Sequence, residues 1–318
     1  MVKGLINILN KEKGMFKNEY IKFDENTNLC VYIWEPTTEN IVGTVQLAHG
    51  MAEHLTRYDE FAQFLNNYGF RVIGADHYAH GKSVTDIGEI GVVRDYDFME
   101  SILLSIKLIR TEYDALFSGK KILFSHSMGS MAAQRYIELY PNDFEKVIIS
   151  GTDYPWVKYG LAKLLTSGNG KKGKIVYSNF IHNMGVGSFN NKFKKENTTE
   201  VAWLSNDFEV QKKYLDCPMC GQMFPANYYH SLATMLLESK KKKNRSLIDR
   251  NLELMILSGK NDPVGAFGKG PMKLAKNYLK LGLNVHTKLY DNARHECLNE
   301  LSDIKSKVYN DILSFIED

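Results

Sequence analysis

The sequence alternates short apolar runs with helical patterns over most of its length. Eight runs have the length and composition of buried strands, at residues 20–23, 29–34, 42–48, 71–75, 121–124, 146–150, 252–258 and 284–290. From the third run onward, helical patterns lie between them, at residues 58–68, 98–117, 131–140, 272–281 and 303–316. Such alternation is typical of βαβ units, so we expect an α/β fold with a mostly parallel sheet. The first two runs predict an antiparallel hairpin at one edge.

One strand-to-helix turn carries a serine at its apex. The apolar run that ends at Phe124 leads into Ser125-His126-Ser127-Met128-Gly129, and a helical pattern follows. This is the layout of a nucleophile elbow, which lifts the serine hydroxyl toward a base and toward backbone N–H groups. Ser125 stands where the usual pattern has glycine, at a position that needs a small side chain. The alternative is a serine in an ordinary turn, and the flanking sequence favours the elbow.

Length and composition indicate a globular chain. Its 318 residues, 44% of them hydrophobic, can bury roughly three quarters of the unfolded surface in one core. No run reaches the roughly 20 apolar residues of a membrane span, and residues 1–12 lack a signal-type apolar stretch. We expect a cytoplasmic protein with a short N-terminal helix at residues 2–9. The net charge of +3 is too small to indicate a nucleic-acid partner. The oligomeric state stays open.

Residues 152–249 interrupt the alternation and predict an insertion. The chain then divides into a first core part, 1–151, a cap or lid, 152–249, and a second core part, 250–318. The insertion holds 15 lysines and arginines against 8 acidic residues, whereas the remainder holds 25 against 29. We interpret the dense run Lys240–Lys243 as a solvated helix end or loop. Contact of the basic cap with an anionic membrane surface, or with a phosphate-bearing substrate, is the alternative.

The four cysteines predict no metal or redox centre by themselves. Cys217 and Cys220 form a C-x-x-C pair, whose spacing could suit a redox pair or half a metal site, but no second pair exists. Ordinary reduced thiols are the expectation, with no metal and no organic cofactor.

Two further side chains complete a serine, acid and histidine in the chain order of α/β hydrolases. Asp262 follows the apolar run 252–258, and His295 follows the next run, on a loop before the last helix. Each has an ordinary alternative, a turn-forming aspartate before proline and a solvated loop histidine. Their position relative to Ser127 favours the catalytic interpretation. We expect His126 to point away from the apex.

An oxyanion hole is predicted after the third strand. There, Gly50 allows the backbone to turn so that the N–H of Met51 can face a developing oxyanion beside the N–H of Met128. Loss of one such donor typically costs about 2.7–4 kcal/mol of transition-state stabilisation.

The motifs together resemble the monoacylglycerol lipase and lysophospholipase branch of the α/β hydrolases, grouped with serine aminopeptidase-like hydrolases (Hydrolase_4). Residues 49–58 resemble the family's HGxxEHxxRY, and residues 75–83 its DHxGHGxS turn, with Ala79 in place of glycine. The elbow, Asp262 and His295-Glu296 also resemble the corresponding motifs of the family. Residues 203–207 and 214–221 resemble the family's cap, although Cys217 replaces a common aspartate.

This resemblance implies the eight-stranded α/β-hydrolase sheet flanked by helices, with residues 152–249 as a lid over the site. It also implies that Glu53 and Arg57 bind the alcohol part of an ester, with a structural ion pair as the equal alternative. Apolar lid residues could line an acyl channel: Phe180, Met184, Phe189, Met219, Met223, Phe224 and Met235.

The sequence therefore predicts a serine hydrolase that cleaves monoacylglycerol- or lysophospholipid-like esters, with Ser127, His295 and Asp262 as the triad. Small or aryl esters, thioesters and peptide amides are alternative substrates for the same triad. A catalytically silent ligand-binding protein is the alternative outside enzymes. The expected partner is a small-molecule or lipid ester.

Overall fold

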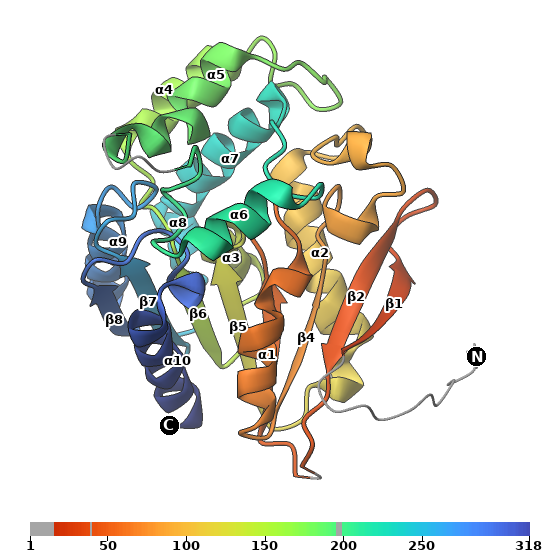
Figure 1. The fold of residues 1–318 in the computed structure, drawn as a ribbon, viewed down its shortest axis with the longest axis vertical. Helices are drawn as coiled ribbons and strands as arrows, with labels where there is room; N and C mark the ends of the chain where they lie inside the picture. Colours follow the sequence, from red (N-terminus) through yellow and green to blue (C-terminus); the bar gives the residue numbers. More distant parts are fainter. Residues whose placement is uncertain (1–15, 39, 195–198) are drawn as a thin grey trace.

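The computed structural model describes residues 16–38, 40–194 and 199–318. Its centre is one eight-stranded sheet in the order β1-β2-β4-β3-β5-β6-β7-β8 (Figure 1). The strands are β1 (Lys17–Lys22), β2 (Asn28–Trp34), β3 (Gly43–Ala48), β4 (Phe70–Ala75), β5 (Lys120–His126), β6 (Lys146–Ser150), β7 (Glu253–Gly259) and β8 (Asn284–Tyr290). The helix expected at residues 2–9 lies outside the described residues.

The strand directions confirm the expected α/β-hydrolase sheet. β1 and β2 form an antiparallel hairpin, and β2 pairs antiparallel with β4. Every other pairing is parallel, from β4 through β3, β5, β6 and β7 to β8. The carboxyl ends of these parallel strands therefore meet at one edge of the sheet, where α/β folds place their binding sites.

Helices cover both faces of the sheet. α1 (Asp59–Asn66) and α10 (Ser302–Glu317) pack on one face, and α2 (Phe98–Glu112), α3 (Met128–Leu139) and α9 (Lys269–Lys280) on the other. Successive side chains of a strand point to opposite faces. Accordingly, Leu29, Val31 and Ile33 of β2 join one core, while Cys30, Tyr32 and Trp34 join the other.

The segment between β6 and β7 is helical in its described part and contributes no strand to the sheet. Its helices are α4 (Val157–Thr166), α5 (Asn179–Met184), α6 (Phe208–Asp216), α7 (Ala226–Ser239) and α8 (Lys242–Arg245). α7 packs on α2, α3 and α4, so the segment is anchored to the core beside the elbow helix. In Figure 1, α4, α5 and α7 lie above the sheet, beyond the ends of its central strands, whereas α8 lies lower, beside α3.

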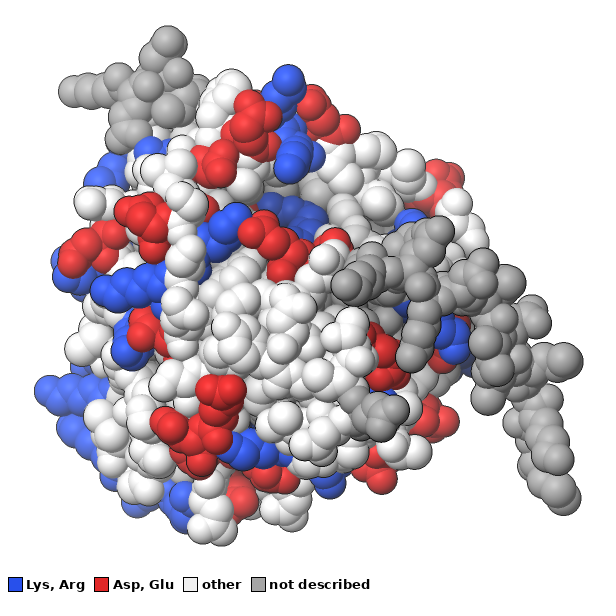
Figure 2. All heavy atoms as spheres, turned by 60° about the horizontal axis from the view of Figure 1, so that its bottom comes forward, with Lys and Arg blue, Asp and Glu red and all other residues white. Residues whose placement is uncertain are grey.

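No helix within the described residues is both long and apolar enough to cross a membrane. On the face drawn in Figure 2, basic and acidic side chains alternate around an uncharged central area. That face therefore presents no broad field of a single sign.

Candidate active site

Ser127 sits where β5 ends and α3 begins, in a backbone conformation that L-residues seldom adopt. Its φ is 52° and its ψ −116°, and its N–H donates to the carbonyl of Ser150 at 2.9 Å. Gly129 permits the turn, because a Cβ there would lie 2.4 Å from the carbonyl oxygen of Ala48. Ser125, the departure from the usual glycine, is fully buried and donates its hydroxyl to the carbonyl of Ile148 at 2.7 Å. The turn thus has the strained geometry of a nucleophile elbow.

Two backbone donors lie beside the serine. Within the described residues, the N–H groups of Met51 and Met128 donate to no other group. Gly50 brings the first of these loops close, since a Cβ on Gly50 would lie 3.1 Å from Cβ of Ser127. Glu53 fixes this loop, residues 49–54, by accepting a 2.5 Å hydrogen bond from the N–H of Gly50. We call residues 49–54 the oxyanion loop, after the role that the sequence predicts for it.

His295 and Asp262 meet in the interior. Nδ1 of His295 lies 3.0 Å from Oδ1 of Asp262, and both side chains are at most 2% exposed. The N–H direction falls outside hydrogen-bond geometry, and such bonds commonly tighten only when substrate is bound. The N–H of Val264 and the hydroxyl of Ser258 also donate to Asp262, at 2.8 and 3.3 Å. The carboxylate is therefore held facing the imidazole.

Burial lowers the pKa of His295, but the negative charge of Asp262 outweighs it, with help from Glu296 and Glu53. The net effect raises the pKa above the usual value of histidine. A base with a raised pKa takes up a proton more readily, which suits the transfer from a serine hydroxyl.

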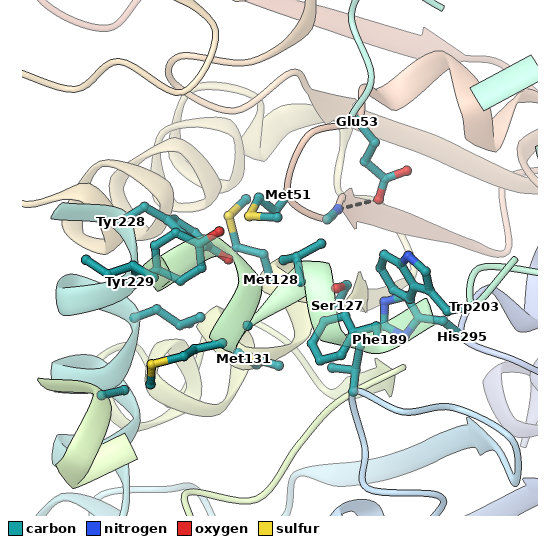
Figure 3. A pocket seen from close by; sticks show the side chains of 18 of the residues that line it. Met51, Glu53, Ser127, Met128, Met131, Phe189, Trp203, Tyr228, Tyr229 and His295 are labelled. Carbon is teal, nitrogen blue, oxygen red and sulfur yellow. Dashed lines mark hydrogen bonds between the residues drawn. The ribbon is translucent and has the colours of Figure 1, made fainter. Parts of the chain in front are cut away.

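The structure brings Ser127 and His295 to one cavity. Both line it (Figure 3), and no hydrogen bond links the serine hydroxyl to a described residue. The expectation that His126 points away from the apex is wrong, since His126 lines the same cavity as Ser127 and its ring lies 4.7 Å from the ring of His295. Gly151 makes room for this pair, because a Cβ there would lie 2.9 and 3.0 Å from the two Cε1 atoms. Burial and the neighbouring His295 lower the pKa of His126 to about 4, so its ring is neutral.

The segment between β6 and β7 contacts the loop after β8, which carries His295 and Glu296. The N–H of His295 donates to the carbonyl of Trp203 at 3.3 Å, and that of Glu296 to the carbonyl of Leu204 at 2.7 Å. The Trp203 ring lies 5.0 Å from the His295 ring. The position of the imidazole therefore depends on the inserted segment as well as on the sheet.

A buried ionic group closes the polar end of the cavity. Arg57 donates to Glu53 at 2.5 Å and to both oxygens of Glu296, at 2.7 and 2.6 Å. Burial raises the pKa of each carboxyl, but Arg57 outweighs it and lowers both below the usual value. Tyr58 also donates to Glu53 at 2.9 Å, and Arg57 stacks 5.0 Å from the ring of Tyr214. Glu296 is a site residue that the sequence placed only by resemblance.

The cavity has a volume of about 270 Å³ and a mainly apolar wall. Apolar side chains of the wall include Met51, Met131, Leu161, Leu165, Ile181, Met184, Val186, Phe189, Leu232 and Val264. Of the apolar lid residues proposed from the sequence, Met184 and Phe189 line this cavity. Phe180 is instead 65% exposed, and Phe224 and Met235 are buried in the core.

A family model described as "Serine aminopeptidase, S33" (Hydrolase_4) matches residues 39–302. The chain belongs to this family. It is 26% identical to the monoacylglycerol lipase of Mycolicibacterium smegmatis over 291 residues. This alignment covers 89% of this chain and 91% of the relative. It is 25% identical to the human monoglyceride lipase over 295 residues, 89% of this chain and 84% of that one.

Solved structures show the same fold. A carboxyl esterase from Bacillus coagulans in complex with glycerol superposes with a TM-score of 0.83 at 24% identity, covering 95% of this chain and 99% of the other. The monoglyceride lipase of Saccharomyces cerevisiae, bound to a substrate analogue, gives 0.74 at 17% identity, over 96% and 97%. This chain is thus a Hydrolase_4 α/β hydrolase whose relatives are ester hydrolases of the monoglyceride lipase and esterase kind.

Proposed function

We propose that the protein is a serine ester hydrolase for esters of one long acyl chain with a small polar alcohol, such as monoacylglycerols or lysophospholipids. The observation that carries this proposal is the strained Ser127 turn, which opens beside His295 into a cavity with an apolar wall and one polar end. The names of the relatives, monoglyceride lipases and an esterase crystallised with glycerol, support the substrate class.

In the proposed reaction, Oγ of Ser127 attacks the ester carbonyl while His295 takes the hydroxyl proton. Asp262 orients the imidazole and stabilises its charged form. The N–H groups of Met51 and Met128 bind the oxyanion, and His295 then protonates the departing alcohol. Water, activated by His295, attacks the acyl-enzyme and releases the acid. No metal or organic cofactor is required.

The two ends of the cavity suit the two parts of such an ester. The apolar wall formed by Met131, Leu165, Met184 and neighbouring residues would surround the acyl chain. Glu53 and Arg57 would face the alcohol part. Because Glu53 and Arg57 already bond to each other, and Arg57 to Glu296, they can also act by fixing the loops around the alcohol part.

The inserted segment would form a lid that meets the lipid surface. Val157, Leu161 and Leu164 of α4 are 84%, 55% and 69% exposed, which is unusual for large apolar side chains on one short helix. Lys158 and Lys163 lie on the same helix, so apolar and cationic groups could bind an anionic membrane together. We propose a transient contact of this kind.

The same triad could act on amides, thioesters or small esters. An aminopeptidase needs a free carboxylate to bind the substrate's ammonium group. The carboxylates that line the cavity, Glu53 and Glu296, share the guanidinium of Arg57. This arrangement favours esters over peptides with a free amino terminus.

A hydrolysis panel tests the proposal: monoacylglycerols, lysophospholipids, aryl esters and acyl thioesters of graded chain length, and aminoacyl amides. We expect the highest kcat/KM for long-chain monoesters, and labelling of the wild type by a fluorophosphonate probe. Ser127→Ala should lose both, with turnover reduced by up to about a millionfold. Preference for acetyl esters would reject the lipid substrate, and an unlabelled serine would reject the enzyme.

A further inference from the structure

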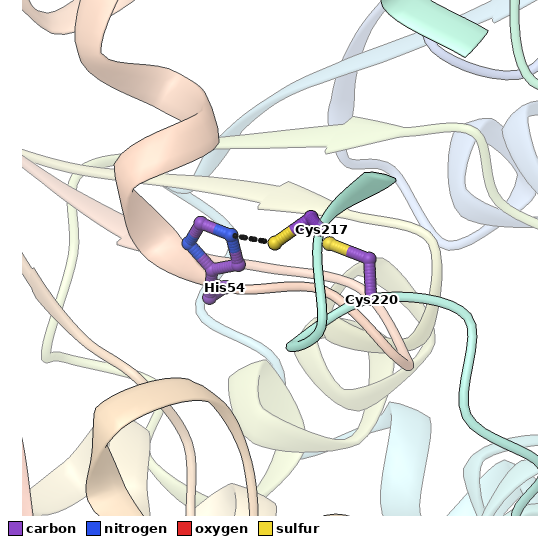
Figure 4. A group of neighbouring side chains, drawn as sticks. All are labelled: His54, Cys217 and Cys220. Carbon is purple, nitrogen blue, oxygen red and sulfur yellow. Dashed lines mark hydrogen bonds between the residues drawn. The ribbon is translucent and has the colours of Figure 1, made fainter. Parts of the chain in front are cut away.

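One histidine and two cysteines converge where α6 meets the oxyanion loop. His54 ends that loop, Cys217 follows the last residue of α6, and Cys220 follows after one turn (Figure 4). Nε2 of His54 lies 3.3 Å from Sγ of Cys217. One donor atom from each of the three residues lies within 4.8 Å of the other two. The histidine is buried and both cysteines are half-buried.

We propose that His54, Cys217 and Cys220 bind a zinc ion. Thiolate and imidazole are the ligands that Zn²⁺ prefers, and C-x-x-C is a usual spacing for two of them. With metal–ligand distances of about 2.0–2.3 Å, tetrahedral zinc places its donors about 3.5–3.8 Å apart. The three donors are therefore within about 1 Å of a binding arrangement, which small side-chain rotations can supply.

The backbone already holds the two sulfurs in a chelating turn. The N–H of Cys220 donates to the carbonyl of Cys217 at 3.0 Å, so the loop bends between them. The other two cysteines, Cys30 and Cys297, are fully buried elsewhere in the fold. Binding would release the two thiol protons to solvent, and the two thiolates would then balance the charge of the ion. Water would occupy the fourth position.

The surroundings of His54 also suit a metal ligand. Its Nδ1 lies 2.8 Å from Oγ1 of Thr56. If Nδ1 carries the proton and donates to that hydroxyl, Nε2 keeps its lone pair and faces the sulfurs. Ligating histidines almost always donate their other ring N–H to an acceptor, usually a carboxylate, a backbone carbonyl or water, and here the Thr56 hydroxyl would take that place. Thr56 would thus fix both the tautomer and the ring orientation.

A bound ion would fasten the inserted segment to the oxyanion loop. The two already touch, because the N–H of Gly221 and the hydroxyl of Tyr214 both donate to the carbonyl of Ala52, at 3.0 and 3.1 Å. Zinc would add a third, stronger link across the same junction. The site is distinct from Ser127 and His295, and it does not depend on the proposed ester chemistry.

The test measures metal binding directly on the full-length, reduced protein. After chelation and dialysis, we expect uptake of one Zn²⁺ per chain. Co²⁺ in its place should give a thiolate-to-metal charge-transfer band and the visible spectrum of a tetrahedral site. Zinc should raise the melting temperature, and a chelator should lower it again.

Matched variants locate the site. Cys217→Ser/Cys220→Ser retains Cys30 and Cys297 and should lose the stoichiometric zinc and the cobalt spectrum, while an unchanged circular dichroism spectrum and cooperative thermal unfolding show that the metal-free variant is folded. Thr56→Val should weaken zinc binding about 10–100-fold. The proposal is overturned if the wild type binds no zinc, if the double variant binds it equally, or if the two thiols form a disulfide in preference to the metal complex under a cytosol-like thiol buffer.

Discussion

Replacement of Ser127 by glycine should stabilise the fold while it abolishes activity. The φ of 52° and ψ of −116° at Ser127 belong to a region that a Cβ disfavours and that glycine enters freely. Residues held in such regions store about 1–3 kcal/mol. The hydroxyl bonds to no described residue, so its removal breaks no hydrogen bond within the described part of the chain.

The matched reference is Ser127→Ala, which lacks the hydroxyl but keeps the Cβ. Glycine gains the strain energy and loses about 0.5–1 kcal/mol through the greater freedom of its unfolded chain. With a gain of about 2 kcal/mol and a loss of about 0.75 kcal/mol as central values, the net difference of about 1 kcal/mol favours Ser127→Gly. Because 1 kcal/mol shifts the melting temperature of a chain of this size by about 2 °C, we expect that of Ser127→Gly to exceed that of Ser127→Ala by about 2 °C.

Scanning calorimetry at one fixed scan rate measures this difference, with urea titration as a check against irreversible unfolding. Ser306→Gly is the control: it makes the same chemical change at an exposed position inside α10, where the backbone is helical. That variant should lose about 0.5 kcal/mol, the helix-propensity difference. If Ser127→Gly melts at or below Ser127→Ala, the turn stores no strain and the argument for a pre-organised elbow is wrong.

Three other changes test the site. Asp262→Asn should lower kcat/KM by about 10⁴-fold; since Asp262 raises the pKa of His295, any residual activity should keep its acidic limb at lower pH than the wild type, which a pH–rate profile would show. Arg57→Met leaves two buried carboxylates without their cation and should lower the free energy of unfolding in urea by about 3–5 kcal/mol. Arg57 lowers the pKa of Glu53 and Glu296, so the stability it gives is present above the pKa of these groups in the unfolded chain and is lost as pH falls through their pKa in the folded protein. The loss of stability in the variant should therefore shrink in acid, and a loss that is independent of pH would contradict the ion-pair role. Gly129→Ala puts a methyl 2.4 Å from the carbonyl oxygen of Ala48 and should cost about 1–3 kcal/mol together with most of the activity, whereas Gly160→Ala, which has open space inside α4, should be neutral or stabilising; equal melting temperatures for the two would refute the packing argument.

The sheet and the order of the candidate triad could be predicted because both follow from local patterns. Alternating strand and helix periods place the carboxyl ends of β5, β7 and β8 at one edge. Residues just after those strands, Ser127, Asp262 and His295, must then lie near one another, whatever the details of packing. The pairing of His295 with Asp262 at 3.0 Å agrees with this expectation.

Contacts that depend on the space left by a glycine, or on a partner far away in the sequence, could not be predicted in this way. His126 meets His295 because Gly151 lacks a Cβ at the end of the neighbouring strand. No periodicity of the sequence carries that information. The pairing of Arg57 with Glu296 spans 239 positions, and only the fold brings them together.

The inserted segment was the least predictable part, because an apolar residue does not reveal which surface it faces. Phe180 and Met184 lie on the same short helix, yet Met184 lines the cavity and Phe180 is mostly exposed. Phe224 packs among the rings of His80, Phe98 and Tyr228 in the core. The direction of each helix, which the sequence does not determine, decides between these outcomes.

Arg57 could act by binding the alcohol part of the substrate or by positioning the loops around the site, and steady-state kinetics of an Arg57 variant distinguish these two roles. Through Glu53 it holds the N–H of Gly50, and therefore the loop that carries Met51. Through Glu296 it holds the residue next to His295.

If Arg57 acts mainly by binding the alcohol part of the substrate, its loss raises KM and leaves kcat for simple aryl esters unchanged. If it acts mainly by positioning the two loops, kcat falls for every ester, including those with no polar alcohol, because the oxyanion donor and the base are both displaced. The bidentate contact with Glu296 and the 2.5 Å contact with Glu53 use Arg57 for internal pairing, so the second outcome is the one we expect.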